Sequence, residues 1–427
     1  MAVFSNRACF GIIGLRGERG VTDGLLYKKD TDFVRDNMLI NYCLGDDESL
    51  LIESFVRNNG ICLRFDVGRF YFFMTGTHKK FITGYTPMTF SEGVDSALAI
   101  YDLMLETLRQ NGFDGNAFLV KIDNSKQVGV LFSPRADAAC PADQMAQKML
   151  DAYTRAKDPY PVSGEDCTST SFVGPFSGYD QIHKAFVQAR ALNDLIFFGV
   201  RGRVITEDFR RETARPCDST AIVGNVRKLM HLLCVGTCAQ ALRQAEYIVD
   251  ALVAPSYSMA NFDAMYASTE DIRSMIEIVY DIPITRREKT SFFFLTDYRQ
   301  KLCDAIRYFF ARMEGRKRYS PTVLLALSYI RRNFTQEISL TQLSEYVYAN
   351  ASVLSRDFGA EVGMTLTEYV AALRVERAKR LLAENERTIE KIAEECGYTG
   401  AKYFREQFKR LTGLSPQAYR AKMTADA

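Results

Sequence analysis

Long apolar runs are absent from this sequence: no stretch of roughly 18 apolar residues occurs, so we expect no membrane-spanning helix. The N-terminus also lacks the basic start, long apolar centre and small-residue cleavage site of a secretory signal. Histidine is scarce, and none of His78, His183 and His231 stands in a recognisable catalytic-triad setting. These absences predict a cytoplasmic protein without an obvious catalytic residue.

Cysteine is present but lacks metal-site spacing. The ten cysteines are scattered, and only Cys234 and Cys238 lie close together, with His231 nearby. A zinc site usually needs two such pairs, or histidines at ligand spacing. We therefore favour small apolar cysteines in the core of a buried helix, Val226–Leu252, over a metal site. No metal or other cofactor is expected.

The length of 427 residues corresponds to two to four domains at about 150 residues each. With 47% apolar and 25% charged residues, the composition is that of a globular protein and excludes wholly disordered, collagen-like and coiled-coil classes. We expect a multidomain α+β protein with five parts: an N-terminal segment 1–36, an α+β domain 37–210, a helical region 211–314, a basic linker 315–322 and an all-α domain 323–427.

Strand-like and helix-like segments alternate in the first large domain. The predicted strands are Phe70–Met74, Phe118–Ile122, Val128–Phe132, Thr170–Val173 and Phe197–Ile205, and the predicted helices are Ser91–Gln110, Asp143–Ala156 and Tyr179–Leu192. This strand-helix-hairpin-helix-strand order predicts an α/β sandwich, one sheet with helices on one face. The helical region that follows carries periodic segments at Val226–Leu252, Ser268–Tyr280 and Thr290–Met313, for which we predict a coupling or dimerisation role.

An internal repeat marks the last hundred residues. Leu354, Phe358 and Gly363 recur fifty residues later as Phe404, Phe408 and Gly413, whereas Leu340 and Leu343 recur after forty-nine as Ile389 and Ile392. Helix starts are signalled by Ser339 with Gln342, by Thr365 with Glu368, and by Ser415-Pro416. These two spacings predict two helix-turn-helix units whose turns differ by one residue. A helix Leu366–Leu382 would join them.

The second helix of such a unit enters the major groove of DNA. In helix Ala351–Val362 the outward residues are Ser352, Ser355 and Arg356. In the second unit they are Lys402, Arg405 and Glu406, with Lys409 and Arg410 further along. Arginine suits guanine, whereas a glutamate accepts from cytosine but repels phosphate. From Arg316 onward there are 18 basic against 13 acidic residues, a weak hint of a polyanion partner. The alternative is a helical bundle with a solvated basic face; the paired turns and three caps favour DNA binding.

Residues 323–420 resemble the DNA-binding domain of the AraC/XylS family of transcription regulators. The resemblance is carried by Ile338–Leu343, Leu354–Phe358, Tyr369–Arg374, Ala378, Leu381–Leu382, Ile392–Tyr398, Tyr403–Lys409 and Gly413–Arg420. It implies base contacts from Ser352, Ser355, Arg356, Lys402, Arg405 and Glu406. The sequence departs from the family at Ser344, at Gly400 and at Arg405-Glu406, which bears on the base preference of the second unit.

Residues 37–205 resemble the divergent nucleotide-cyclase-like domain of some long regulators, through Asn41–Gly60, the strand at Phe70 and Ala185–Gly199. A working cyclase needs carboxylates at two places. Here Asn124–Val128 occupies the hairpin, and Met74-Thr75-Gly76 stands where a metal-binding aspartate is expected. Without carboxylates a two-metal phosphoryl transfer has no ligands. The resemblance therefore implies a binding or dimerising ferredoxin/cyclase-like scaffold.

The favoured function is a sequence-specific transcription regulator, an activator, that binds double-stranded DNA as a homodimer. Its N-terminal part would respond to a small-molecule or protein effector, and RNA polymerase would be a partner. Three alternatives remain: a nucleotide enzyme with a DNA-binding tail, a sensor of a cyclic dinucleotide or other small ligand, and a DNA-modifying protein with a reactive cysteine. The missing carboxylates argue against the first, and the lack of an activated cysteine context against the last.

Overall fold

The computed structural model describes residues 39, 43, 63–78, 90–122, 125–156, 168–285, 292, 294–384 and 387–425. The chain divides into two compact units, one formed by Met1–Pro216 with Thr290–Tyr298 and the other by Cys217–Lys289 with Arg299–Ala427. The predicted N-terminal segment 1–36 and the stretch Asn41–Gly60 lie outside the described residues, apart from Cys43. Among the described residues, no helix combines the length and apolar character needed to cross a membrane.

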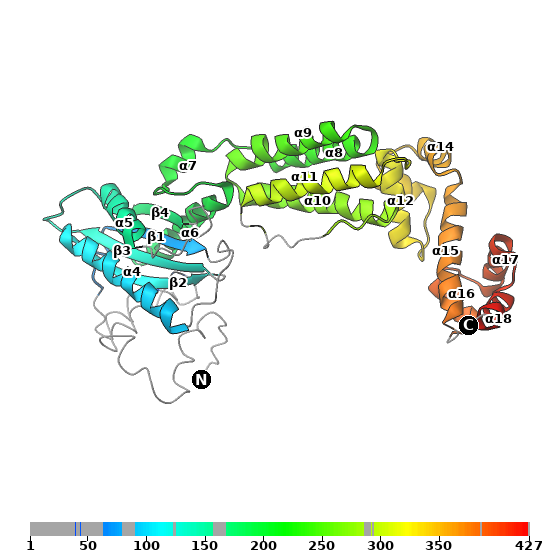
Figure 1. Ribbon diagram of the computed structural model, residues 1–427, viewed down its shortest axis with the longest axis horizontal. Helices are drawn as coiled ribbons and strands as arrows, with labels where there is room; N and C mark the ends of the chain where they lie inside the picture. The colour runs from blue at the N-terminus through cyan, green and yellow to red at the C-terminus, as the bar shows by residue number, and fades with distance from the viewer. Residues whose placement is uncertain are drawn as a thin grey trace, which may run out of the picture. The chain divides into compact units, whose positions relative to one another are not determined.

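The first unit is built on a four-stranded antiparallel sheet with the strand order β2-β3-β1-β4 (Figure 1). Its elements follow the predicted strand-helix-hairpin-helix-strand order: β1 Phe70–His78, α4 Phe90–Gln110, β2 Phe113–Ile122, β3 Ser125–Pro134, α5 Ala142–Ala156 and β4 Thr168–Phe176. After β4 come α6 Gln181–Asn193, the short 3-10 helix η4 Asp194–Phe198 and α7 Glu207–Thr213.

Alternating residues of β1 supply two apolar faces, because successive side chains of a strand point to opposite sides. Tyr71 and Phe73 join α4 and α5 in one buried cluster. Phe72 faces the other side, where its ring makes an edge contact with Phe186 of α6 at 6.2 Å. The predicted placement of all helices on one face of the sheet is therefore wrong, since α6 covers the second face.

The predicted closing strand Phe197–Ile205 is also wrong for most of its length. Phe197 and Phe198 lie in η4, and Gly199 ends it in the left-handed conformation with φ 87°. Only Ile205 pairs with the sheet, through a single parallel bridge to Ser171. Here an aromatic run fits a tight helical turn as well as a strand, so composition alone misled the prediction.

The second unit is helical in its described residues, and its first part is the region predicted to be helical. It contains α8 Ser219–Val235, α9 Cys238–Glu246, the π-helix η5 Tyr247–Val253, the 3-10 turn η6 Ala254–Ser256, α10 Met259–Tyr280 and, from Arg299 onward, α11 Leu295–Arg312. A single helix Val226–Leu252 is not formed. The helix stops at Gly236, and Thr237 begins α9 with a capping box to Gln240.

The C-terminal helices follow the predicted double unit (Figure 1). They are α12 Pro321–Asn333, α13 Leu340–Tyr346, α14 Ala351–Val362, α15 Leu366–Ala383, α16 Ile389–Glu395, α17 Ala401–Thr412 and α18 Pro416–Ala425. Ser339 and Thr365 form the two predicted capping boxes, with Gln342 and Glu368. Gly363 and Gly413 end α14 and α17 in the left-handed conformation, as expected.

Candidate nucleic-acid interface

The first helix-turn-helix unit is α13 and α14. Asn350 caps α14, and its side chain accepts from the amides of Ser352 and Val353 at 2.9 and 3.4 Å. Leu354 and Phe358 are buried, each 1% exposed, so this side of α14 packs into the domain. The spacing of four residues between them fixes the opposite side of the helix as the free one.

That free side carries the three predicted residues. Ser352, Ser355 and Arg356 are all exposed. The side chain of Arg356 is 73% exposed, and its Nε lies 3.0 Å from Asp357 Oδ1 on the same helix. An ion pair so open to solvent is weak, so the guanidinium is available to a partner that offers two acceptors.

The second unit is α16 and α17, and an aromatic core holds it. Phe404 and Phe408 are fully buried with ring centroids 5.7 Å apart. Tyr398 packs against Phe404 at 5.3 Å, and Tyr419 of α18 meets Phe408 edge-on at 5.5 Å. The inward positions predicted from the repeat are thus the core positions of α17. Gly400 begins α17 without a side-chain cap, in agreement with its noted departure from the family pattern.

The opposite side of α17 exposes Lys402, Glu406 and Lys409. Arg405 differs from them. Its Nη2 lies 2.5 Å from Glu390 Oε1 of α16, and its side chain is 40% exposed. The sequence pattern placed Arg405 with the free residues, whereas in the structure it is already bound to a carboxylate that a DNA acceptor would have to displace.

The two turns share one backbone pattern. The amide of Ala349 donates to Ser344 O, and forty-nine residues later the amide of Tyr398 donates to Ala393 O, both in the 2.9–3.0 Å range. The extra residue of the second turn therefore comes after Tyr398, where the difference in repeat length placed it.

Two exposed tyrosines near these helices were missed by the sequence analysis. Tyr348 is 95% exposed and adopts φ 54°, the left-handed conformation that its counterpart Gly397 adopts with φ 83°. Tyr403, beside Lys402 on α17, is 53% exposed. The repeat itself held a signal for the first: a bulky residue stands where the second unit has glycine, and such backbone strain is often retained at functional sites.

Several arginines in the C-terminal part are used inside the fold. Arg374 of α15 donates to Phe334 O and Gln336 O, each at 2.7 Å, and its guanidinium lies over the Tyr398 ring at 5.3 Å. Arg420 donates to Arg387 O at 2.6 Å. Some of the excess basic residues after residue 315 therefore bind carbonyls of the fold, and only the others are available to a polyanion.

Burial makes the described core cysteines poor nucleophiles. It raises the pKa of the Cys234 thiol to about 12 and that of Cys396 to about 11, and it also raises the pKa of Cys43 and Cys303. A reactive cysteine needs the opposite shift, because the thiolate is the attacking species. Within the described ranges, His, Cys, Asp and Glu side chains form no group of three or more suited to a metal ion.

In the compact unit that contains the sheet, Thr75 is the residue at which the sequence resemblance implies a carboxylate in a working cyclase, and it is paired with another hydroxyl. Thr75 is fully buried in β1, and its Oγ1 lies 2.8 Å from Thr170 Oγ1 of β4. Neither hydroxyl is a strong ligand for Mg²⁺, which prefers carboxylates, phosphates and water. The turn expected at 123–127 is wrong for its last three residues, because β3 begins at Ser125 and residues 125–127 pair with β2. Residues 123–124 lie outside the described residues.

Comparison with known proteins matches the C-terminal part. Residues 343–422 match the helix-turn-helix domain family. The probable transcriptional regulator LumQ of Photobacterium leiognathi is 31% identical over 97 residues, which are 23% of this chain and 39% of that protein. The bifunctional transcriptional activator/DNA repair enzyme AdaA of Bacillus subtilis (strain 168) is 35% identical over 101 residues, 24% of this chain and 48% of that protein.

Among solved structures, the C-terminal domain of AraT, a response regulator from Geobacillus stearothermophilus, is 34% identical; the match covers 25% of this chain and 88% of that chain with a TM-score of 0.24. The chain spans less than half the length of the two curated relatives. The family match, the identity to transcription regulators and the repeated unit of α13–α14 and α16–α17 together identify residues 343–422 as an AraC-type helix-turn-helix domain.

Proposed function

We propose that this protein is a sequence-specific DNA-binding transcription regulator that inserts α14 and α17 into two successive major grooves. The observation that carries the proposal is the same division of both helices: apolar residues at i and i+4 are buried, and polar residues cover the opposite side. A reading helix needs this division, because one side must hold it in the domain while the other meets base edges. Successive major grooves on one face of DNA recur about every 34 Å.

The contacts differ between the two helices. Ser352, Ser355 and Arg356 are the proposed base contacts of α14, with Arg356 donating twice to a guanine. On α17 we propose base contacts from Lys402, Arg405 and Glu406, and a phosphate contact from Lys409. Arg405 reaches a base only when it leaves Glu390, so it contributes less than Arg356.

We further propose that the compact unit built on the four-stranded sheet is a non-catalytic scaffold of the ferredoxin/cyclase-like type, with a sensory or dimerising role. The β-α-β-β-α-β order with an antiparallel sheet supports the fold, and the Thr75–Thr170 pair supports the lack of catalysis. In this proposal the protein acts in the cytoplasm as a homodimer and an activator, and an effector bound by the N-terminal part controls its contact with RNA polymerase.

Selection of duplex DNA from a randomised pool by the purified full chain tests the proposal, with binding repeated across salt concentrations. We expect a motif of two short blocks about one helical turn apart, or a pair of such motifs. Binding without a motif and with a steep salt dependence would reduce the function to electrostatic attachment. An absence of binding at low salt would refute the proposal.

A further inference from the structure

The segment predicted to be a basic linker binds the helical region through its arginines. Arg318 Nη1 donates to Leu233 O at 3.1 Å and to Gly236 O at 2.8 Å, at the end of α8. Its guanidinium also lies over the Phe310 ring of α11 at 5.1 Å. The last carbonyls of a helix lack internal partners and carry partial negative charge, so a guanidinium satisfies and stabilises them.

The end of α10 is bound in the same way. Arg316 Nη2 donates to Tyr280 O at 3.0 Å, and Arg331 Nη1, from α12, donates to Ile278 O at 2.6 Å. The rings of Tyr280 and Tyr319 stack with centroids 5.7 Å apart, and the Tyr319 amide donates to the Tyr280 hydroxyl at 2.9 Å. Residues 316–319 are thus bound to the helical region α8–α11 and are not an unattached linker.

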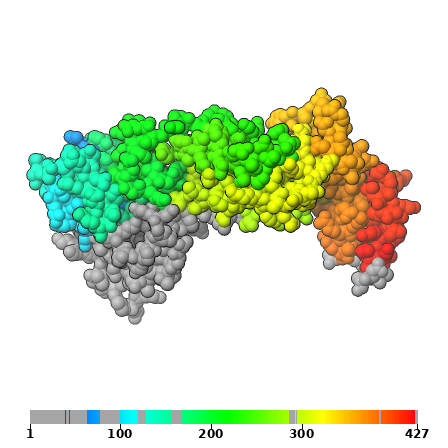
Figure 2. Space-filling model, turned by 45° about the horizontal axis from the view of Figure 1, so that its top comes forward, coloured from blue at the N-terminus to red at the C-terminus, as the bar shows by residue number. Residues whose placement is uncertain are grey.

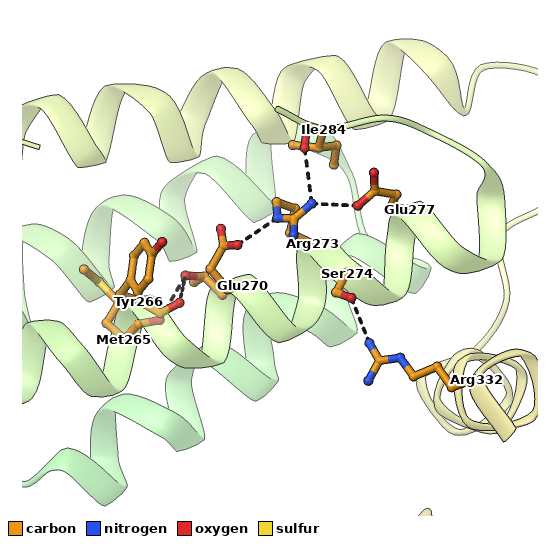
Figure 3. Close-up of polar contacts among 9 residues, drawn as sticks. Met265, Tyr266, Glu270, Arg273, Ser274, Glu277, Ile284 and Arg332 are labelled. Carbon is orange, nitrogen blue, oxygen red and sulfur yellow. Dashed lines mark hydrogen bonds and ion pairs between the residues drawn. The ribbon is translucent and has the colours of Figure 1, made fainter. Parts of the chain in front are cut away.

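Figure 3 shows a second attachment between α10 and α12, where Arg332 Nη2 donates to Ser274 Oγ at 2.9 Å. On the same helix, Arg273 binds Glu270 and Glu277 at 2.9 and 2.7 Å and the carbonyl of Ile284 at 3.3 Å (Figure 3). These bonds hold the chain that leaves α10 against the helix. In Figure 2 the green atoms of α8 and α9 lie against the yellow atoms of α11 and α12.

The same segment also holds the first reading helix. Ser320 N donates to Glu361 Oε2 at 2.7 Å, and Lys317 Nζ donates to Glu361 O at 2.5 Å. Glu361 lies in the last turn of α14, two residues before Gly363 ends that helix. Arg331 reaches further, because its Nε donates to the Tyr369 hydroxyl of α15 at 2.7 Å, and the Tyr369 ring packs edge-on against Phe358 of α14.

The second helix-turn-helix unit, α16 and α17, is attached differently. Arg405 of α17 binds Glu390 of α16, and Arg420 of α18 donates to the carbonyl of Arg387, just before α16. Arg374 of α15 binds the carbonyls at 334 and 336 and lies over the Tyr398 ring. We infer that the helical region α8–α11 fixes the orientation of the first reading helix, α14, and that Arg318 and Glu361 are the positioning residues. The second reading helix, α17, takes its orientation from α15. This inference rests on the proposed function for its effect on DNA, but not for the coupling itself.

Two variants of the full-length chain break the attachment at its two ends. Arg318→Met removes the bonds to α8, and Glu361→Ala removes the acceptor of Ser320 N. The matched controls are Arg307→Met, which removes an exposed cation from α11, and Glu376→Ala, which removes a carboxylate paired within α15. Glu361→Gln keeps the shape and one acceptor oxygen, and serves where the alanine variant loses its helical circular dichroism.

Hydrogen exchange of the DNA-free protein tests the coupling directly. We expect faster exchange of the α14 amides in both variants, unchanged exchange in α17, and the wild-type pattern in both controls. Equal acceleration in α14 and α17, or none in either, would overturn the inference. Because no DNA is present, this result is independent of the proposed function.

Base-substituted binding sites test the consequence for reading. The half-site that belongs to each helix is assigned first with Arg356→Ala and Lys402→Ala. In Arg318→Met and Glu361→Ala, discrimination between correct and substituted bases should fall about 2- to 30-fold at the α14 half-site, and stay at the wild-type value at the α17 half-site. A purely structural role would weaken both half-sites equally, and this result would refute positioning. Failure of the wild type to bind any DNA would refute the proposed function alone.

Discussion

The two helix-turn-helix units share a backbone but are stabilised by different means. The first begins α13 with a reciprocal capping box, Ser339 with Gln342, and α14 with the Asn350 cap. In the second, the Thr388 side chain caps α16 by accepting from the amide of Lys391. The other helix, α17, begins after Gly400 and has no side-chain cap. The second unit compensates with aromatic packing. A repeated fold therefore does not imply repeated energetics: side chains cap both helices of the first unit, whereas the second has an uncapped α17 and a larger aromatic cluster.

The largest expected effect is on that core. Phe408→Ala should destabilise the second unit by about 3–5 kcal/mol, because a fully buried ring that contacts Phe404 and Tyr419 leaves a cavity. Chemical denaturation of the full chain measures this loss of stability, and hydrogen exchange in α14 and α17 shows which unit is affected. The loss of protection should be confined to the second unit. Unchanged unfolding of this variant would mean that Phe408 is not a core residue.

Glycines of the second unit give the next effect. Gly397 and Gly413 both have positive φ, at 83° and 79°, but a Cβ on Gly397 would lie 2.2 Å from Thr335 O, whereas one on Gly413 would meet no atom within 4 Å. Gly413→Ala should cost about 1–2 kcal/mol, the cost of a left-handed residue. Gly397→Ala should cost clearly more, because the backbone must also move. Equal midpoints in urea for the two variants would contradict this order.

The two helix-turn-helix units should also differ in how a substitution changes DNA binding. Arg356→Ala should weaken binding by about 1–3 kcal/mol and relax the preference at one base pair, whereas Lys409→Ala should weaken binding to all sequences alike and lower the salt slope by about 1. Titrations of the selected site and of single-base variants at several salt concentrations distinguish these effects. A uniform loss in the Arg356 variant would assign that residue to phosphate.

Local signals explain how much of the C-terminal domain the sequence predicted. The bounds of α14 agree with the predicted Ala351–Val362, because two core positions lie within the segment and a cap and a terminal glycine lie directly beside it. The break of the predicted helix Val226–Leu252 also had a local signal, Thr237 with Gln240 after Gly236, which the helical periodicity outweighed. Where a segment encodes its own ends, sequence reasoning locates them.

Contacts distant in sequence explain what was missed. The basic segment at 316–318 appeared as a linker because its arginines bind carbonyls 36 to 85 residues away, and a backbone carbonyl leaves no mark in a sequence. The pairing of Arg405 with Glu390 and the position of α6 on the second face of the sheet are equally non-local. The base-contact residues other than Arg405 remain predictions whose exposure agrees with the proposed role.

The smallest expected effect concerns the capping boxes, of which one can titrate and one cannot. Glu368 closes the box at the start of α15, and hydrogen bonds from the Thr365 amide and hydroxyl hold the pKa of its carboxyl below the usual range. A lowered folded-state pKa contributes stability that is present above the unfolded pKa and is lost as the pH falls through the folded pKa. The corresponding box of α13 uses Gln342, which does not titrate.

Glu368→Gln provides the test, because it makes the second box chemically like the first. Urea unfolding of the wild type and of Glu368→Gln between neutral and acidic pH should show the difference in stability between them shrinking as the pH falls below the usual range for a glutamate. The variant keeps an acceptor for the Thr365 amide, so the gap at neutral pH should be small. A gap that stays constant through acidic pH would mean that the carboxylate charge does not contribute, and that the two boxes stabilise their helices in the same way.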